Sequence, residues 1–306
     1  MLSVVTSLYW SAPHLREFHR RASLAAAAVD ADYEIVLVDD GSPDDSLAVA
    51  LELQAADPHV VVIDLSRNFG HHRAIMTGVA HARGDRVFLL DCDLEEAPEL
   101  VIEFAERMRA EDCDMVYGVQ VERKGGWFER ASGDLYYRLF NLLSSAPGPR
   151  NIVTARLVSR RMVDALLRYG EQVTWMDGLF ALAGFRQVGV PVIKGSKGES
   201  TYTLRRKLKM FVDSITDFSE VPLHLIFWAG FAISLMSGAY IAYLLVQKLF
   251  LGVSVDGWTS VIVSLWFLGG MTILFLGIIG IYLSKIFIET KRRPSTIVRK
   301  VHRHGQ

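Results

Sequence analysis

The stretch Phe88-Leu-Leu-Asp-Cys-Asp-Leu-Glu-Glu-Ala-Pro-Glu99 runs from an apolar segment directly into a cluster of acidic side chains. Apolar runs bounded by polar residues are typical of strands buried on both faces of a sheet. Asp91 and Asp93 would lie at the end of such a strand. On an extended segment they point the same way, while Cys92 points into the fold. The stretch alone predicts either a metal site or a polar turn, because turns also favour aspartate.

The chain around this stretch alternates short apolar runs with amphipathic segments. The runs predicted as strands are Ser3–Leu8, Glu34–Val38, Val60–Leu65, Val87–Leu90 and Met115–Tyr117. Helical patterns lie near Pro13–Ala28, Ser46–Ala56, His72–Ala82 and Glu99–Arg109. This alternation predicts an α/β domain with a mostly parallel sheet, whose ligands bind beyond the carboxyl ends of the strands.

Polar groups recur at the ends of two earlier predicted strands. Asp39 and Asp40 end the second strand, and Leu65-Ser-Arg-Asn-Phe-Gly70 ends the third. With these companions, Asp91 and Asp93 favour the metal site over the polar turn. Mg²⁺ or Mn²⁺ prefers carboxylate oxygens and could neutralise the charge on a departing diphosphate. We interpret the following His71 and His72 as the start of a helix and not as metal ligands, because adjacent side chains on a helix point apart.

Composition limits the classes of protein to consider. The 306 residues have a mean hydropathy of +0.24 and a net charge of −1, so no strong field points to nucleic acid. Cys92 and Cys113 are too few for a disulfide framework and are consistent with a reducing compartment. The first ten residues lack the basic flank of a signal peptide, and they read as a buried strand.

The second half of the chain has a different character. Val221–Val246 and Thr259–Ser284 contain no Asp, Glu, Lys or Arg, and each is long enough to cross a bilayer. Basic residues flank the pair on both outer sides: Arg205, Arg206, Lys207, Lys209, Lys291, Arg292 and Arg293. The positive-inside rule therefore predicts a hairpin of two transmembrane helices with both ends in the cytoplasm.

We expect four segments in all: a catalytic domain over 1–203, an amphipathic interfacial helix over 204–219, the two spans within 220–288, and a basic cytoplasmic tail over 289–306. In the interfacial segment apolar residues at helical spacing accompany a basic cluster, which suits a helix in the headgroup plane. We expect the tail to be loosely ordered and to face the lipid.

The motifs Asp39-Asp40-Gly41-Ser42, Leu65-Ser-Arg-Asn-Phe-Gly70 and Asp91-Cys-Asp-Leu-Glu95 resemble, in their order, those of family 2 glycosyltransferases of GT-A fold. Together with the two-span C-terminus, they are similar to the membrane-anchored polyprenyl-phosphate glycosyltransferases, a group that includes dolichyl-phosphate mannose synthases and bactoprenol glucosyltransferases. The resemblance runs over nearly the whole chain and reaches Gly277-Ile-Ile-Gly-Ile-Tyr282.

The resemblance implies roles for individual residues. The residues implied to bind a nucleotide-sugar donor are Tyr9, Asp39, Asp40, Arg67, Asn68, Asp91, Cys92, Asp93 and Glu95. Asp91 and Asp93 would hold the Mg²⁺ or Mn²⁺ ion. The residues implied to contact the acceptor phosphate are Arg123, Lys124, Lys194, Lys197, Ser200 and Tyr202. Asp91, Asp93, Asp177 and Arg123 are the expected catalytic residues.

The chain also departs from the family pattern. Trp10 and Ser11 replace a polar pair after Tyr9, which puts base recognition in doubt. Thr154 stands where many relatives carry an Asp often proposed as a base, and Asp177 is a candidate substitute. A lipid phosphate is already an anion near neutral pH and needs no such base, whereas a sugar hydroxyl does. The departure mildly favours a lipid-phosphate acceptor.

The resemblance thus implies an inverting transfer of one sugar from a nucleotide-sugar to a polyprenyl phosphate. The enzyme would be a multi-pass protein of the cytoplasmic (inner) membrane, and a homo-oligomer is consistent with its small-residue helix faces. A uridine donor is mildly preferred, and the sugar is left open. Two alternatives are transfer to a hydroxyl of a glycolipid or glycan, and a non-catalytic protein that handles lipid-linked sugars.

Overall fold

The structure is a computed structural model that describes residues 1–120, 151–170, 176–193, 219–251 and 257–304. Contacts divide the chain into two units. The first unit contains every described strand together with helices α1 to α4, α6 and α7, and the second contains helices α9 and α10. The two units are described separately below.

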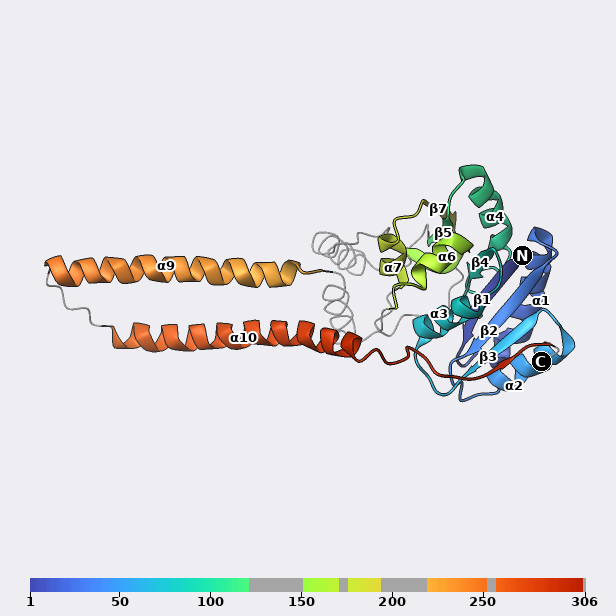
Figure 1. The fold of residues 1–306 in the computed structure, drawn as a ribbon, viewed down its shortest axis with the longest axis horizontal. Coiled ribbons are helices and arrows are strands. Elements are labelled where there is room, and N and C mark those ends of the chain that lie inside the picture. The colour runs from blue at the N-terminus through green and yellow to red at the C-terminus, as the bar shows by residue number, and fades with distance from the viewer. Residues whose placement is uncertain (121–150, 171–175, 194–218, 252–256, 305–306) are drawn as a thin grey trace. The chain divides into compact units, whose positions relative to one another are not determined.

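The first unit alternates strands and helices along most of its length (Figure 1). Its strands β1 to β8 span Leu2–Leu8, Tyr33–Asp39, Val60–Leu65, Arg86–Leu89, Met115–Gln120, Ile152–Ser159, Gln187–Val192 and Val298–His302. Its helices α1, α2, α3, α4, α6 and α7 span Ala12–Val29, Ser46–Ala56, His71–His81, Leu100–Glu111, Arg160–Leu166 and Met176–Leu182. The five strands and four helices predicted from the sequence are all present.

The strands form one sheet in the order β7-β5-β6-β4-β1-β2-β3-β8. Strands β1 to β4 pair in parallel, with β1 between β2 and β4, and β5 pairs in parallel with β7. Strands β6 and β8 run antiparallel to their neighbours. The sheet is therefore mostly parallel, as predicted, and the ends of β1 to β4 meet at one edge.

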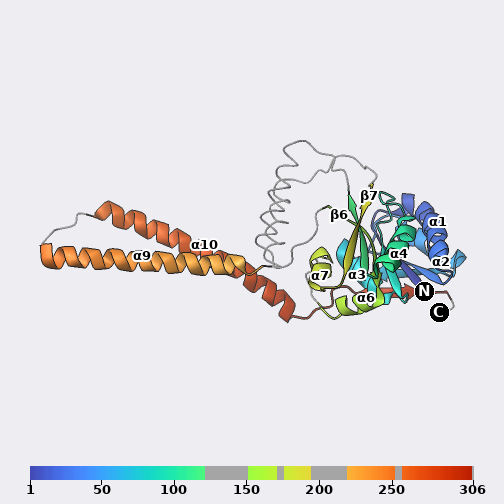
Figure 2. The ribbon, with the colours of Figure 1, turned by 90° about the horizontal axis from the view of Figure 1, so that it is seen from above.

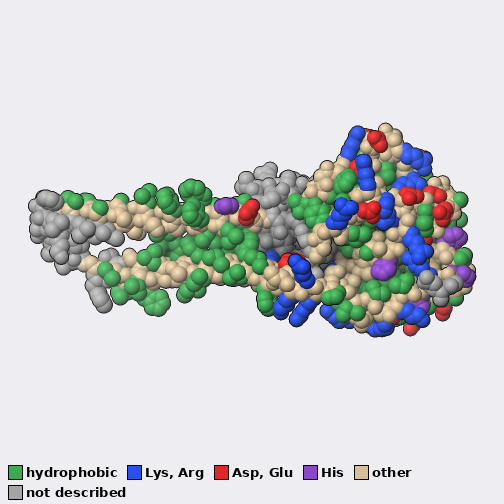
Figure 3. All heavy atoms as spheres, in the orientation of Figure 1, with side chains coloured by type: hydrophobic (Ala, Val, Ile, Leu, Met, Phe, Trp, Pro, Cys, Tyr) green, Lys and Arg blue, Asp and Glu red, His purple; other side chains and the backbone are tan. Residues whose placement is uncertain are grey.

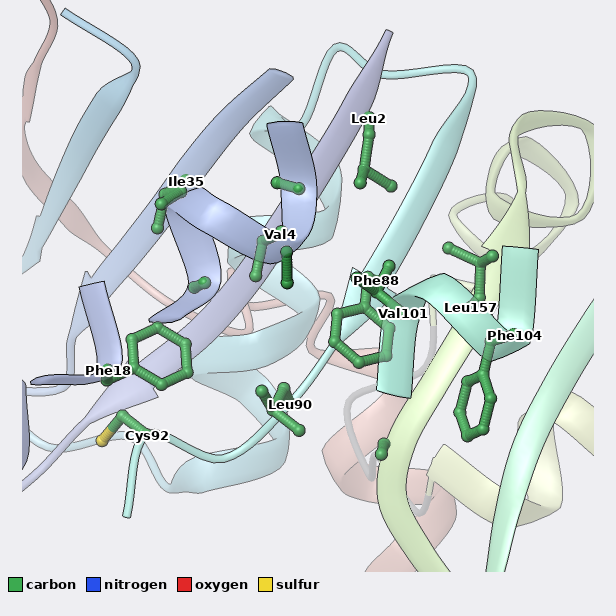
Figure 4. Packing of buried hydrophobic residues seen from close by; sticks show 14 of the residues in the cluster. Leu2, Val4, Phe18, Ile35, Phe88, Leu90, Cys92, Val101, Phe104 and Leu157 are labelled. Atoms are coloured by element: carbon green, nitrogen blue, oxygen red, sulfur yellow. The ribbon is translucent and has the colours of Figure 1, made fainter. Parts of the chain in front are cut away.

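Helices cover both faces of this sheet (Figure 2). Helices α1, α2 and α4 cover one face, where Phe18 and Phe104 pack among strand residues such as Val4 and Phe88 (Figure 4). Helices α3, α6 and α7 cover the other face. Because both faces are covered, β1 to β3 are almost continuously apolar and buried, which explains why their sequences read as apolar runs.

The C-terminal tail corrects one expectation. Residues Val298–His302 form β8, which pairs antiparallel with β3, so this part of the tail is not loosely ordered. Val298 and Val301 pack against the apolar core on the α3 face of the sheet. The tail from Arg293 onward belongs to the first unit, and it completes an edge of the sheet that lies far upstream in the sequence.

The second unit consists of α9, Val221–Leu251, and α10, Trp258–Thr290. Among the described residues, these two helices are long and apolar enough to cross a membrane. Large apolar side chains such as Phe227, Trp228 and Trp266 are exposed on them (Figure 3). An apolar solvent would cover such a surface, as a hairpin of membrane helices requires.

One contact within the second unit joins the two helices at the side where the hairpin is open. The hydroxyl of Tyr282 in α10 donates to the carbonyl of Ser219, just before α9, at 2.7 Å. The interfacial helix expected over residues 204–219 lies almost entirely outside the described residues, and so does the link at 252–256.

Gly78 provides a test of how α3 packs on the sheet. A Cβ atom at this position would lie 2.4 Å from a methyl group of Val5 and 2.8 Å from one of Val38. We expect Gly78→Ala to lower the free energy of unfolding of the protein by about 1–3 kcal/mol through overpacking. In an open helix the same change would raise it by about 0.5–1 kcal/mol. Chemical denaturation measures the sign, and Ala80→Gly, at an exposed position of α3, controls for helix propensity.

Candidate active site

Left-handed backbone conformations gather at the carboxyl ends of the four parallel strands β1 to β4. The turns after these strands contain Trp10, Gly41, Gly70 and Leu94, with φ angles of 59°, 64°, 100° and 63°. Glycine adopts this conformation without penalty, whereas Trp10 and Leu94 each carry a strain of about 1–2 kcal/mol. Strained residues cluster at functional sites, and this edge of the sheet is where an α/β fold binds its ligands.

The two aspartates at the end of β2 play different parts. Both carboxylate oxygens of Asp40 accept backbone hydrogen bonds, from the amides of Phe69 at 2.7 Å and Gly70 at 2.9 Å. Asp39 is 2% exposed, and its Oδ1 has no hydrogen-bond partner among the described residues, while its Oδ2 accepts from the amide of Ser42. Burial raises the pKa of both carboxyls. Asp40 thus holds the loop after β3. Asp39 keeps one oxygen that can accept a hydrogen bond from a ligand.

The loop after β3 packs tightly against the turn at Gly41. A Cβ atom on Gly41 would lie 2.6 Å from the backbone carbonyl carbon of Arg67, so only glycine fits there. The guanidinium of Arg67 lies 4.1 Å from the centre of the Phe69 ring and donates to the carbonyl of Asn68. The side chains of Arg67 and Asn68 are exposed at the carboxyl edge of the sheet, where the sequence placed them.

Asp91 is oriented from two sides. The hydroxyl of Thr154 in β6 donates to its Oδ2 at 2.8 Å, and Nε2 of His71 lies 3.4 Å from its Oδ1. The other ring nitrogen of His71 is 2.8 Å from the hydroxyl of Ser7 in β1. The expected helix start at His71 is confirmed, but sequence reasoning missed that its first ring would lie beside Asp91. The sequence drew attention to Thr154 only because it stands where many relatives carry an Asp. In the structure it is a direct hydrogen-bond partner of the Asp91 carboxylate.

The segment after β4 is a turn and not the extended chain expected from the sequence. Leu94 is left-handed, and the amide of Glu95 donates to Oδ1 of Asp93 at 3.0 Å. Cys92 is buried, as predicted, and its thiol donates to the carbonyl of Ser7 (Figure 4). Burial raises the pKa of Cys92 to about 11, so the thiol is neutral. Asp91 and Asp93 remain partly exposed, and only the backbone of Cys92 can face a ligand.

Glu96 is a site residue that sequence reasoning missed. It is 1% exposed, and its carboxylate accepts hydrogen bonds from the amides of Thr154 at 3.2 Å and Ala155 at 2.6 Å. Hydrogen bonds to a charged, buried group are among the stronger ones in proteins. Glu96 therefore fixes β6 against the acidic turn and sets the position from which Thr154 reaches Asp91.

Asp177, the candidate base, forms an ion pair. The guanidinium of Arg156, which is almost fully buried, lies 2.9 Å from Oδ1 of Asp177 and stacks at 4.8 Å on the ring of Phe180. Both Asp177 and Asp91 lie near enough to His72 for their charges to raise its pKa, although desolvation by surrounding protein atoms outweighs them and lowers it. The carboxylate of Asp177 is thus already engaged by a cation on β6, two residues from Thr154.

The acidic turn fits a divalent ion that also takes ligands from a substrate. Among the described residues, no group of three or more His, Cys, Asp or Glu side chains is placed to hold a metal. Asp91 and Asp93 offer hard carboxylate oxygens, and Mg²⁺ is commonly bound by one or two carboxylates together with substrate phosphates. The donor set therefore suits Mg²⁺ or Mn²⁺ bound with a phosphorylated ligand better than a metal caged by protein alone.

The remaining predicted site residues divide into two groups, of which Tyr9 alone is described. Tyr9 is 49% exposed at the end of β1, and its ring meets edge to face that of Trp10, which replaces a polar residue of the family pattern and is 62% exposed. The predicted acceptor residues lie outside the described residues: Arg123, Lys124, Lys194, Lys197, Ser200 and Tyr202.

Known proteins are similar to this chain over most of its length. Residues 3–167 match the model of glycosyl transferase family 2. The chain belongs to this family. It is 47% identical to a Mycobacterium tuberculosis protein named as a putative glycosyltransferase. The alignment covers 98% of this chain and 88% of that protein. Two further relatives have more specific names.

The first is a Shigella flexneri bactoprenol glucosyl transferase derived from a prophage, 31% identical over 89% of each chain. The second is the undecaprenyl-phosphate 4-deoxy-4-formamido-L-arabinose transferase of Sodalis glossinidius, 32% identical over 98% of this chain and 93% of that one. These matches place this glycosyltransferase in the polyprenyl-phosphate group of the family.

The fold also agrees with that of a solved structure. The Pyrobaculum calidifontis mannosyltransferase PcManGT, solved with GDP-mannose and Mn²⁺, aligns with a TM-score of 0.50 at 18% identity, over 70% of this chain and 62% of that one. The predicted GT-A fold is confirmed. Membership of the family and the names of the relatives support a glycosyltransferase over the non-catalytic alternative.

The two neighbouring aspartates of β2 give a paired prediction. We expect Asp39→Asn to leave the free energy of unfolding at pH 7 unchanged or raised, because it removes a buried charge with an unpartnered oxygen. Asp40→Asn should lower it by about 1–3 kcal/mol, because one oxygen must then serve two amides.

The pH dependence follows from the direction of the pKa shift. Because folding raises the pKa of Asp39, its ionisation costs stability only as the pH rises above the unfolded value near 4. Any gain from Asp39→Asn should therefore vanish in denaturation experiments below that pH. Equal losses for both variants at pH 7 would contradict the division of roles.

Proposed function

We propose that this glycosyltransferase transfers a single sugar from a nucleotide-diphospho-sugar to a polyprenyl phosphate at the cytoplasmic face of a membrane. The observation that carries the proposal is the extent of the similarity. Relatives named for bactoprenol and undecaprenyl phosphate align over 89% and 98% of this chain. The longer of the two alignments includes both long apolar helices. A lipid acceptor gives a reason for a catalytic domain to be joined to membrane helices.

The carboxyl edge of the sheet would bind the donor. The nucleoside would lie against the unpartnered oxygen of Asp39 and beside the exposed rings of Tyr9 and Trp10. Arg67 and Asn68, which the Asp40 contacts hold in place, would line the same pocket. A UDP-sugar is our preferred donor, and the family's inverting course is the one we propose.

Asp91 and Asp93 would hold Mg²⁺ or Mn²⁺, which when bound would screen the charge of the diphosphate leaving group. The protein's own contribution is to orient the acidic turn beforehand. Thr154 and His71 fix the carboxylate of Asp91, and Glu96 fixes the strand that carries Thr154. Such preorganisation spares the reaction the cost of rearranging polar groups.

The surroundings of Asp91 also bear on the acceptor. A hydroxyl acceptor must lose a proton as it attacks, so a base normally assists it. At the expected position of the base this chain has Thr154, whose hydroxyl is used by Asp91, and the carboxylate of Asp177 is engaged by Arg156. A polyprenyl phosphate arrives as an anion and requires positioning instead, which suits this arrangement.

The basic flanks of the helices support the membrane topology that we propose. Lys291, Arg292 and Arg293 follow α10, and the cluster Arg205–Lys209 precedes α9, whereas residues 247–257, at the far end of the hairpin, have one Lys and one Asp. By the positive-inside rule the catalytic domain and both termini then lie in the cytoplasm.

Asp91→Asn and Asp93→Asn test the proposed function directly. We expect each to lower turnover by about 10²- to 10³-fold, because charge on the leaving diphosphate loses its screen. The assay measures release of nucleoside diphosphate from a panel of nucleotide-sugars by the full-length protein with polyprenyl phosphate and Mg²⁺ or Mn²⁺. Asp112→Asn is the control, since Asp112 lies before β5, exposed, and Asn tolerates its left-handed backbone. Normal turnover by the Asp91 variant would refute the proposal.

Asp177→Asn separates the two classes of acceptor. The amide keeps an oxygen for Arg156, so we expect turnover with polyprenyl phosphate to stay within about tenfold of the wild type. If the physiological acceptor were a hydroxyl, the variant would lose about 10²- to 10⁴-fold in rate while still binding the donor. Parallel assays with polyprenyl phosphate and with glycolipid acceptors distinguish these outcomes.

A further inference from the structure

The C-terminal strand is bonded to the start of the loop that carries Arg67 and Asn68. The amide of Ser66 donates to the carbonyl of Ile297 at 2.9 Å. The guanidinium of Arg299 donates to both carboxylate oxygens of Asp64, at 3.1 and 3.0 Å, and to the carbonyl of Ser66 at 3.0 Å. One side chain of the tail therefore joins the end of β3 to the first residue of the loop.

An irregularity in the pairing of β8 places Arg299 at this position. Asp64 pairs with Lys300, and the next residue of β3, Leu65, pairs with Val298, so Arg299 is an extra residue between two regular pairs. An extra residue of this kind redirects its side chain relative to the pleat of the strand. Here the redirected side chain reaches the carboxyl edge of the sheet and contacts Asp64 and Ser66. Arg299 and the neighbouring Lys300 are both exposed.

The loop is therefore held at both ends. Ile297 and Arg299 hold Ser66, and Asp40 holds the amides of Phe69 and Gly70. The two exposed side chains between these ends, Arg67 and Asn68, are those expected to meet the donor. A loop fixed only at its far end would lose part of this ordering and pay for it on binding.

Arg299 also compensates a charge beside the donor site. Asp64 is buried and lies next to Asp39 in the register of β2 and β3. Burial is the main cause that raises the pKa of Asp39, and the negative charge of Asp64 raises it further. Without Arg299, the carboxylate of Asp64 would be an uncompensated negative charge next to Asp39, against which we propose that the donor binds.

We propose that Arg299 is a positioning residue for donor binding, through which the strand that follows the two apolar helices holds the Ser66–Gly70 loop ready for a nucleotide-sugar. The inference rests on the proposed function, because it takes the donor to bind at Arg67 and Asn68. Nothing in the role requires contact between Arg299 and the donor. It assigns the tail to the catalytic site instead of to the lipid surface.

The test measures donor and acceptor kinetics of full-length protein in lipid nanodiscs. We expect Arg299→Gln to raise the KM for the nucleotide-sugar by about 5- to 20-fold. An effect of this size is typical when hydrogen bonds between charged groups are lost. Both kcat and the KM for polyprenyl phosphate should stay within about twofold of the wild type. Lys300→Gln removes the same charge from the same strand and should leave all three constants unchanged.

A double-mutant cycle isolates the part played by charge. Asp64→Asn in the Arg299→Gln background removes the uncompensated carboxylate, so we expect it to recover part of the lost donor affinity. A purely structural loss would instead lower the melting temperature and impair donor and acceptor constants alike, which would overturn the proposal. Equal effects of Arg299→Gln and Lys300→Gln, abolished when anionic lipid is omitted, would assign the tail to the membrane surface and overturn it too.

Two failures are distinguishable. Wild-type protein that releases no nucleoside diphosphate from any donor would refute the proposed function, and the inference with it. Active wild-type protein with an unchanged donor KM in the Arg299→Gln variant would refute the inference alone.

Discussion

The buried carboxylate of Asp40 is the group on which the arrangement of the site depends. It accepts the amides of Phe69 and Gly70, two donors that would otherwise be left unpaired in a tightly packed turn. Gly70 leads directly into α3, whose first residue, His71, lies against Asp91. One carboxylate at the end of β2 thus fixes the loop after β3 and the helix that reaches the turn after β4.

Much of this architecture could be predicted from the sequence because local signals agree with the global fold. Strands covered on both faces have no polar side to interrupt their apolar runs, so β1 to β4 were evident. Chain direction then brought Asp39 and Asp91 to the same edge. The roles of neighbouring acids could not be predicted in this way: Glu95 and Glu96 read alike, yet only Glu96 is buried with two amides.

The strand β8 could not be predicted for a different reason. Its apolar residues, Val298 and Val301, are three apart and match neither face of a regular strand, because Arg299 is an extra residue in the pairing. Its partner, β3, lies more than two hundred residues upstream, a separation across which local patterns carry no information. The basic residues after the two apolar helices suggested a lipid-facing tail. For residues 298–302 the structure shows instead a strand paired with β3, with Arg299 bonded to Asp64.

The position of β8 after the two long helices has a consequence for biosynthesis. Chains fold from the N-terminus as they leave the ribosome, so β3 is made well before β8. Until β8 is made, the side of β3 that β8 will cover is open, and open edges invite wrong partners. The catalytic sheet is therefore completed only after both long apolar helices have been translated, and maturation of the sheet is tied in time to the fate of those helices.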